Sequence, residues 1–294
     1  MDATTRFREL LEREEILPAM GGYDALSASL IEGAGGEVVY MSGSSVSTST
    51  HAYPDVGVTT MTEMVTRARQ MVNAVDVPVF CDADTGYGNP INVVRTVEEY
   101  ESAGVAGIHI EDQTFPKKCG HFEDKSVVPT EEMVQKIRAA SDARTDDEFV
   151  LIARTDARAV EGFEAAVERS EAYLDAGADV LFFEAPTSES ELRRVGETFE
   201  DVPLVANMTE GGETPLFSAA EFEAMGFDVV LYPATGFKAA ARAMRDVYQE
   251  IAETGTQEGV MDELLTWQGR NDVTGLEDVV ELEERYSTES VTQE

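Results

Sequence analysis

The sequence predicts an α/β fold, a closed (β/α)8 barrel of the TIM type. Eight short apolar runs, each of the length of a buried parallel strand, alternate with longer segments whose apolar residues recur at helical spacing. Several of the helix-like segments end in Ala-Gly or Met-Gly just before the next strand, where a left-handed C-cap glycine belongs. No break in composition separates the units, which favours one closed barrel over an open doubly wound sheet.

The expected elements follow one another along the chain. Strands are expected at ILPAM (16–20), EVVYMS (37–42), VPVFCDA (77–83), GIHIED (107–112), FVLIART (149–155), VLFFEA (180–185), PLVANM (203–208) and DVVLYP (228–233). Helices are expected between them, for example at TEMVTRARQMVNAV, INVVRTVEEYESAG, TEEMVQKIRAASDA, EGFEAAVERSEAYLDAG and AAEFEAMG. We therefore expect the barrel to span residues 1–253. Residues 254–294 are expected to form a C-terminal helical extension that ends in a polar tail.

Acidic residues dominate the charge of the chain. Its 294 residues include 58 Asp and Glu against 22 Lys and Arg, which gives a formal net charge of -36. A field of this sign repels phosphate, so neither nucleic acid nor an anionic membrane is expected as a partner. The acids are spread along the chain and predict a carboxylate-covered surface adapted to a hypersaline cytoplasm, where salt screens the repulsion.

The cysteines and the apolar runs indicate the compartment. Two cysteines, Cys81 and Cys119, do not indicate a disulfide framework, and no apolar run is long enough to span a membrane. The segment MDATTRFRELLEREE lacks an apolar signal core and is typical of an acidic amphipathic helix. These features predict a soluble, cytoplasmic protein.

Acidic side chains follow two neighbouring strands at the end of the barrel where active sites lie. Asp82 and Asp84 are two residues apart and are expected on the same side of an extended segment, with Glu111 and Asp112 on the next strand. Converging carboxylates repel unless a cation neutralises them, and an all-oxygen set suits Mg²⁺ or Mn²⁺ better than zinc. The alternative is that each acid caps the helix that follows it.

Other polar residues follow the remaining strands. Arg154 is expected to face the acids, either as a carboxylate clamp or as a structural, salt-bridged arginine. Ser42, Gly43 and Ser44 are small enough to let backbone amides approach an anion. The strands that come later in the chain are followed by Glu184, Asn207, Thr209 and Lys238. Cys81 is expected to be packed inside a strand, and His51 lies in a Ser/Thr-rich loop with no assigned role.

A thiol stands out in the stretch KKCGH, residues 117–121. Nearby positive charge favours the thiolate and lowers the pKa of a cysteine, although isolated cysteines are usually small buried hydrophobes. Cys119 lies in a long segment between the fourth strand and the helix that is expected to begin near Thr130, and such segments in barrels are often lids. A thiol on a lid over a polycarboxylate site is well placed to exchange a proton with a carbanion.

Nine segments distinguish this chain: YMSGSSV, DADTGYGN, GIHIEDQ, KKCGH, IARTDA, VEGFEAAVERSEAYLDAGAD, LFFEA, NMTEGGETPLF and LYP. Taken together, they resemble the isocitrate lyase and phosphoenolpyruvate mutase superfamily, and within it the 2-methylisocitrate lyases, and the resemblance extends to at least Gln249. It implies a (β/α)8 barrel, Mg²⁺ dependence and a homotetramer whose paired subunits exchange the last barrel helix.

The resemblance also implies roles for single residues. Asp82 and Asp84 would hold the metal, Glu111 would support it through water, and Cys119 would be the catalytic acid, tuned by His121. Substrate would be bound by Ser42, Gly43, Ser44, Gly120, Arg154, Glu184, Asn207, Thr209 and Lys238. Tyr40 is one candidate for the base. Lys238 stands where an arginine is expected, and Ser44 where a glycine is usual, which leaves substrate detail open.

The implied reaction is the retro-aldol cleavage of 2-methylisocitrate to pyruvate and succinate, with the substrate methyl group near Phe182, Leu231 and Pro233. Isocitrate cleavage to glyoxylate and succinate is the alternative, because the Lys-Lys spelling of KKCGH is typical of isocitrate lyases. A phosphonomutase or oxo-acid hydrolase on the same barrel, and a non-catalytic metabolite-binding barrel, are further alternatives. The cysteine in KKCGH counts against the former, and the retained acids and thiol count against the latter.

Overall fold

The computed structural model describes residues 2–118, 120 and 124–287. The chain forms two compact units, Met1–Lys238 and Ala239–Glu294. The boundary between them falls inside one long helix, α11 (Thr235–Thr254), and not between residues 253 and 254, where the sequence was expected to divide.

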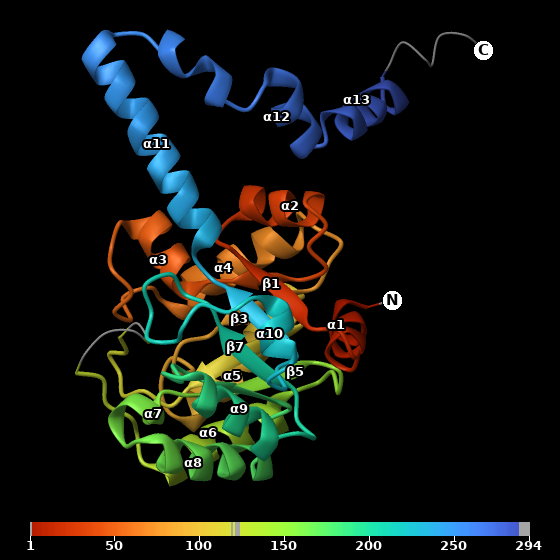
Figure 1. Cartoon of the computed structure of the whole chain (residues 1–294). Helices are drawn as coiled ribbons and strands as arrows, with labels where there is room; N and C mark the ends of the chain where they lie inside the picture. The colour runs from red at the N-terminus through yellow and green to blue at the C-terminus, as the bar shows by residue number, and fades with distance from the viewer. Residues whose placement is uncertain (1, 119, 121–123, 288–294) are drawn as a thin grey trace. The chain divides into compact units, whose positions relative to one another are not determined.

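Eight parallel strands of the first unit form a closed barrel, in which each strand pairs with the next and β8 pairs with β1 (Figure 1). The strands are β1 (Leu17–Gly22), β2 (Val39–Met41), β3 (Val79–Asp82), β4 (Gly107–Glu111), β5 (Val150–Thr155), β6 (Val180–Phe183), β7 (Leu204–Asn207) and β8 (Val229–Tyr232). The predicted fold class is confirmed, and every expected strand is present.

Helices of the first unit connect the strands and surround them. They are α1 (Ala3–Leu11), α2 (Ala25–Gly33), α3 (Gly43–His51), α4 (Met61–Val72), α5 (Pro90–Ala103), α6 (Thr130–Ala143), α7 (Ala157–Val160), α8 (Phe163–Asp175), α9 (Glu189–Thr198) and α10 (Ala219–Glu223).

The Ser/Thr-rich stretch that ends at His51 was predicted to be a loop, and this prediction is wrong because it forms α3. The hydroxyl of Ser42 caps the helix by accepting the Ser45 N–H at 3.4 Å. Ser45, Val46 and Ser47 are buried against the barrel. Burial of this face outweighs the weak helix propensity of serine and threonine.

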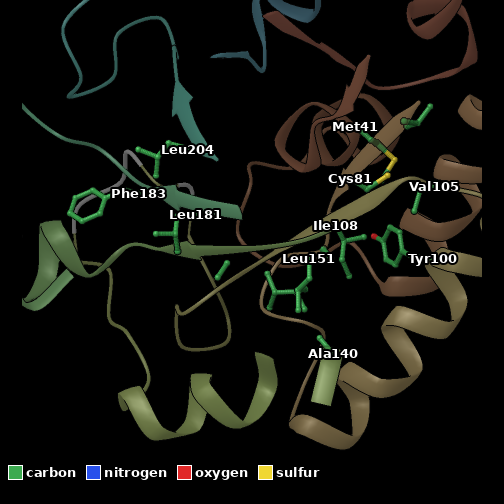
Figure 2. Close-up of a cluster of buried hydrophobic side chains, with 14 of the residues drawn as sticks. Met41, Cys81, Tyr100, Val105, Ile108, Ala140, Leu151, Leu181, Phe183 and Leu204 are labelled. Carbon is green, nitrogen blue, oxygen red and sulfur yellow. The ribbon is translucent and has the colours of Figure 1, made fainter. Parts of the chain in front are cut away.

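Two apolar layers result from the alternation of side chains along the strands. One cluster fills the barrel interior and includes Phe80, Ile152 and Phe182, joined by Phe7 of α1, whose ring stacks on that of Phe80 with the centroids 5.0 Å apart. The second lies on the outer side of the strands. Figure 2 shows part of it, with Met41, Cys81, Ile108, Leu151 and Leu181 contributed by five successive strands. Cys81 is fully buried, as predicted.

The second unit contains the rest of α11 followed by the 3₁₀ helix η1 (Glu258–Glu263), α12 (Trp267–Val273) and α13 (Leu276–Arg285). Among its described residues only Val260 is buried. The helical extension predicted for residues 254–294 thus has helices but almost no core of its own. None of the helices within the described residues is both long and apolar enough to cross a membrane.

Candidate active site

A cavity lies at the carboxyl ends of the strands, where the inward-facing positions change from apolar to polar. Two residues beyond the inward-facing Tyr40, Phe80 and Phe182 come Ser42, Asp82 and Glu184, which therefore face the same side. The described lining consists of Tyr40, Ser42, Ser44, Asp55, Asp82, Glu111, Lys117, Gly120, Arg154, Glu184, Asn207, Thr209, Leu231, Pro233 and Ala234. Most of the residues predicted from strand ends are thus brought together.

The three acids predicted to form a metal site are buried close together. The Asp84 N–H donates to Asp82 Oδ1 at 2.9 Å, and the backbone of Asp84 has a left-handed φ of 47°. Burial raises the pKa of Asp84 to about 7, repulsion by Asp82 and Asp55 adds to this rise, and Lys117 opposes it. Burial also raises the pKa of Glu111 well above its usual range. Glu111 Oε1 is buried without a hydrogen-bond partner.

Asp112, which the sequence placed beside Glu111 in this cluster, faces the other way. It is the next residue along the strand and therefore points outward, where its carboxylate accepts hydrogen bonds from Thr155, Tyr173 and the Asp156 N–H. The prediction that Asp112 converges with the other acids is wrong, because adjacent residues of an extended strand point to opposite faces.

Two residues that the sequence did not single out as ligands complete the acidic cluster. The Lys117 ammonium lies 2.5 Å from Asp55 Oδ1 and 2.8 Å from Asp84 Oδ1, with its side chain only 3% exposed. Asp55 belongs to the loop between α3 and α4, far from any strand end. Its only sequence signal is indirect: lysines are rare in this chain, so one that is buried needs acids to pair with.

The site fits an oxygen-preferring cation. Its side-chain donors are carboxylates, one buried carboxylate oxygen lacks any partner, and an ammonium already lies between two of the acids. Across the described part of the chain, no three His, Cys, Asp or Glu side chains converge closely enough to hold one ion directly. An ion that keeps several of its waters, as Mg²⁺ does, suits such a set.

Arg154 is salt-bridged, as one of the two interpretations predicted, and it also lines the cavity; its role as a carboxylate clamp stays a prediction. It is a paired arginine, since its Nε and Nη2 donate to Asp156 Oδ2 and Oδ1 at 2.9 and 3.2 Å. Its Nε also lies 3.3 Å from Glu111 Oε2, and its guanidinium carbon lies 4.9 Å from the Phe182 ring centroid. Because it also lines the cavity, a substrate carboxylate can reach it.

Polar groups from β6 and β7 form a short hydrogen-bonded chain at the cavity wall. Asn207 Nδ2 donates to both carboxylate oxygens of Glu184, at 3.3 and 3.2 Å. Thr209 Oγ1 in turn donates to Asn207 Oδ1 at 3.0 Å. The contacts fix the orientation of the Asn207 amide, so all three predicted residues present defined donors and acceptors.

Two glycines among the predicted site residues stand where a side chain would collide with the site. A Cβ atom on Gly43 would lie 2.5 Å from Asp82 Oδ2, and one on Gly120 would collide with Arg154 Nη2 and lie 2.6 Å from Glu184 Oε1. Gly43 follows Ser42 at the start of α3, and Ser44 lines the cavity. At both glycines the backbone therefore approaches charged groups of the site closely.

Tyr40, the candidate base, lies beside a histidine. Its hydroxyl is 2.9 Å from His109 Nε2, and both side chains are buried. Burial, together with repulsion by Asp82, raises the pKa of Tyr40 well above its usual range. Burial lowers the pKa of His109 to about 4, so the imidazole is neutral at pH 7. The resting tyrosine is thus protonated and has a neutral imidazole within hydrogen-bonding distance.

The remaining predicted residues are not brought into the described site. Lys238 Nζ lies 2.8 Å from Glu210 Oε2, the lysine side chain is half exposed, and it does not belong to the cavity lining. Cys119 and His121 lie outside the described residues.

The amino-acid sequence is similar to known enzymes over most of its length. The family model described as phosphoenolpyruvate phosphomutase matches residues 7–252. The chain is 47% identical over 288 residues to 2,3-dimethylmalate lyase of Eubacterium barkeri, covering 98% of this chain and 99% of that protein. It is 46% identical over 271 residues to 2-methylisocitrate lyase of Aeropyrum pernix, covering 92% of this chain and 87% of the relative.

Solved structures are similar to this chain over almost its whole length. A crystal structure of 2,3-dimethylmalate lyase, described as a PEP mutase/isocitrate lyase superfamily member, has a TM-score of 0.93 and 38% identity, covering 100% of this chain and 98% of the other. Phosphonopyruvate hydrolase in complex with oxalate and Mg²⁺ has a TM-score of 0.88 and 32% identity, covering 97% of this chain and 99% of the other. The similarity therefore extends over the whole barrel.

Proposed function

The chain belongs to the phosphoenolpyruvate mutase/isocitrate lyase superfamily, and on this premise we propose that it cleaves 2-methylisocitrate to pyruvate and succinate. The lyases among its relatives confirm that the protein is a lyase. One observation carries the choice of 2-methylisocitrate over isocitrate: Leu231, Pro233 and Ala234 give an otherwise mostly polar cavity an apolar stretch. Such a surface suits a methyl group on the carbon that carries the substrate hydroxyl.

The reaction needs a base, an oriented substrate and an acid. The hydroxyl proton leaves, the carbon–carbon bond breaks to give pyruvate, and the electron pair remains on the fragment that is protonated to succinate. Arg154 and Asn207, which line the cavity, would orient carboxylates of the substrate. Tyr40 is the candidate base; because burial keeps its hydroxyl protonated at rest, it takes the substrate proton only in its ionised form, with His109 Nε2 2.9 Å away. Cys119 is the proposed acid, on the grounds of the family resemblance.

We propose Mg²⁺ or Mn²⁺ as the cofactor. Asp82 and Asp84 would hold the ion, with Glu111 contributing through water. When bound, the ion would polarise the substrate hydroxyl and its neighbouring carboxylate. A superfamily structure with oxalate and Mg²⁺ supports this choice.

Cleavage of 2,3-dimethylmalate to pyruvate and propionate is a second candidate function. This substrate has two carboxylates, whereas 2-methylisocitrate has three. The cations in the described cavity lining are Lys117 and Arg154, and both are already paired with acids of the protein. Lys238, which could have served a third carboxylate, contacts Glu210 instead. A dicarboxylate would therefore need fewer cations of the cavity to pair with its carboxylates than a tricarboxylate would.

A coupled assay separates these substrates. Pyruvate release is measured with 2-methylisocitrate and with 2,3-dimethylmalate, glyoxylate release with isocitrate, and the second product is identified by NMR. We expect kcat/KM for 2-methylisocitrate to exceed that for isocitrate by at least about tenfold, because one methyl group changes binding by about 1–3 kcal/mol. Higher efficiency with 2,3-dimethylmalate would select the second candidate, and no pyruvate from either substrate would exclude both.

We further propose a homotetramer in which paired subunits exchange α11, with no nucleic acid or membrane partner. Support comes from the helix itself: Phe237, Ala241, Met244, Tyr248 and Ile251 recur at heptad-like spacing, yet α11 has no buried residue. Light scattering should give a mass of about four times the 32.1 kDa chain. Met244→Glu should lower that mass, whereas Arg242→Glu, which is outside the apolar stripe, should not. A monomeric wild type would contradict the proposal.

A further inference from the structure

The segment between β4 and α6 is joined at its base and carries two lysines whose side chains turn inward. Gln113 and Val127 form an antiparallel bridge, and the Thr114 N–H donates to the Ser126 carbonyl at 2.9 Å. The side chains of Lys117 and Lys125 are each only 3% exposed. Lys117 belongs to the acidic cluster already described, whereas Lys125 has no part in the proposed reaction.

Lys125 joins two groups that are distant in sequence. Its Nζ lies 2.8 Å from Asp156 Oδ1 and also donates to the carbonyl of Gly120. Asp156 is completely buried, and the same Oδ1 accepts a hydrogen bond from Arg154 Nη2 at 3.2 Å. The Asp156 N–H donates to Asp112 Oδ1 at 2.8 Å, which fixes its backbone. One anchored carboxylate therefore pairs with both a cavity arginine and Lys125.

Gly120 is the point at which this arrangement meets the site. The Cα of Gly120 lies against Arg154 and Glu184, with no space for a side chain. A small displacement of Gly120 therefore changes the surroundings of the Arg154 guanidinium. Its carbonyl has a buried ammonium as donor, and a buried acceptor that loses such a donor is costly. The position of Gly120 against Arg154 thus depends on Lys125.

If the protein is the lyase proposed above, we propose that Lys125 is a positioning residue for this reaction. Its ammonium holds the Gly120 carbonyl to the Asp156 carboxylate and so fixes Gly120 against the Arg154 guanidinium. It touches no substrate and acts only through these two neighbours.

Lys125→Met tests this role, because methionine keeps much of the length of lysine but carries no charge. We expect kcat to fall by about tenfold to a hundredfold, with a change in KM of less than about threefold, since misplacing a site group mainly lowers reactivity. Lys125→Arg, which keeps the charge and donors, should recover most of the loss. Alkylation of Cys119 by iodoacetamide should be at least about threefold faster in Lys125→Met, because the adjoining Gly120 is no longer fixed.

Arg158→Met is the matched control. Arg158 is a cation two residues after Asp156, but it pairs with Glu191 at 3.0 Å and does not line the cavity. This variant should keep wild-type kcat and alkylation rate. The proposal is wrong if Lys125→Met keeps the wild-type kcat or the wild-type alkylation rate. It is also wrong if Arg158→Met loses as much kcat as Lys125→Met does.

Two further measures keep the test decisive. If Lys125→Met does not fold, Lys125→Gln replaces it with the same expectations, since an amide has no charge for Asp156. If wild-type protein cleaves none of the substrates, the proposed function fails, and the alkylation rate alone decides whether Lys125 fixes Gly120.

Discussion

The charge on Asp84 depends on which cation lies beside it. Burial raises its pKa to about 7, repulsion from Asp82 and Asp55 acts in the same direction, and Lys117 acts against both. With only the ammonium nearby, this carboxyl exchanges its proton near neutral pH. A divalent ion binds the ionised carboxylate, so proton and metal compete at the same residue.

Metal affinity should therefore depend on pH. We expect the affinity for Mn²⁺ to fall about tenfold for each pH unit below about 7, because one proton must leave Asp84 when the ion binds, and to level off at higher pH. Isothermal titration calorimetry across neutral pH measures this dependence. Asp84→Asn should bind Mn²⁺ more weakly, and its affinity for Mn²⁺ should not change with pH in this range. If the Mn²⁺ affinity of the wild type does not change with pH, Asp84 is not a ligand of the ion. Full activity after exhaustive chelation would contradict the metal site as a whole.

The thiol of Cys119 should be needed for turnover but not for folding. Cys119→Ser should lower kcat by about a thousandfold, because serine is a much weaker acid than cysteine and cannot replace it in proton transfer. Thermal stability and Mg²⁺-dependent ligand binding should stay close to wild type. Cys81→Ala, at the buried cysteine, is the control and should keep its activity. Turnover of Cys119→Ser within about tenfold of wild type would exclude the thiol as the acid.

At the scale of elements, a buried polar cluster joins β4, β5 and α8. Asp112 Oδ2 accepts hydrogen bonds from Thr155 Oγ1 and Tyr173 OH, each at 2.8 Å, and lies 3.5 Å from Arg169 Nη1. Arg169 also donates to the carbonyl of Val128, at the end of the segment before α6. The cluster therefore fixes the outer face of the two strands that carry Glu111 and Arg154.

Removing the cation from this cluster should be costly. Arg169→Met should lower the free energy of unfolding by about 3–5 kcal/mol, because it leaves the Asp112 carboxylate buried without its cation. Arg194→Met, in an exposed pair with Glu164, should have a much smaller effect, because water screens that pair. Urea unfolding measures both. If adding Asp112→Asn to Arg169→Met recovers none of the loss, the buried charge is not its cause.

The strands could be predicted from the sequence because a barrel strand contacts apolar layers on both faces, which leaves an apolar run such as residues 149–155. The α3 helix could not, because Ser45 and Ser47 are helical through burial and not through propensity. In the second unit, the sequence predicted helices between residues 254 and 294, and the structure has η1, α12 and α13 there, with only Val260 buried among its described residues.

For the molecule as a whole, the alternation of strand residues explains why most of the site could be predicted. Once Asp82 and Glu111 are assigned to the inner face, Asp112 follows on the outer face, so its placement could have been corrected from sequence alone. Asp55 and the buried position of Lys117 could not be predicted in this way. Both come from loops, and only the closed fold brings the ammonium to the two acids.

The surface charge is a property of the whole molecule and agrees with the composition. A hollow formed by the end of α8 and the turn after α9 is lined by Glu171, Asp175, Glu200 and Asp201, with no lysine or arginine among its described lining residues. Another, beside the start of α1, includes Glu98, Glu101 and Asp146, likewise without a described cation. Such like charges repel in the folded state unless salt screens them.

Salt should therefore stabilise the folded protein, which carries a formal net charge of -36. Raising KCl from about 0.01 M to about 1 M shortens the Debye length from about 30 Å to about 3 Å, so the melting temperature should rise steeply at first and then level off. Differential scanning calorimetry measures this curve. Sucrose, which is excluded from protein surfaces but screens no charge, should not reproduce the steep part. Equal melting temperatures in dilute buffer and in molar KCl would contradict the predicted adaptation to salt. If sucrose raises the melting temperature as much as KCl does, the stabilisation comes from solute exclusion and not from charge screening.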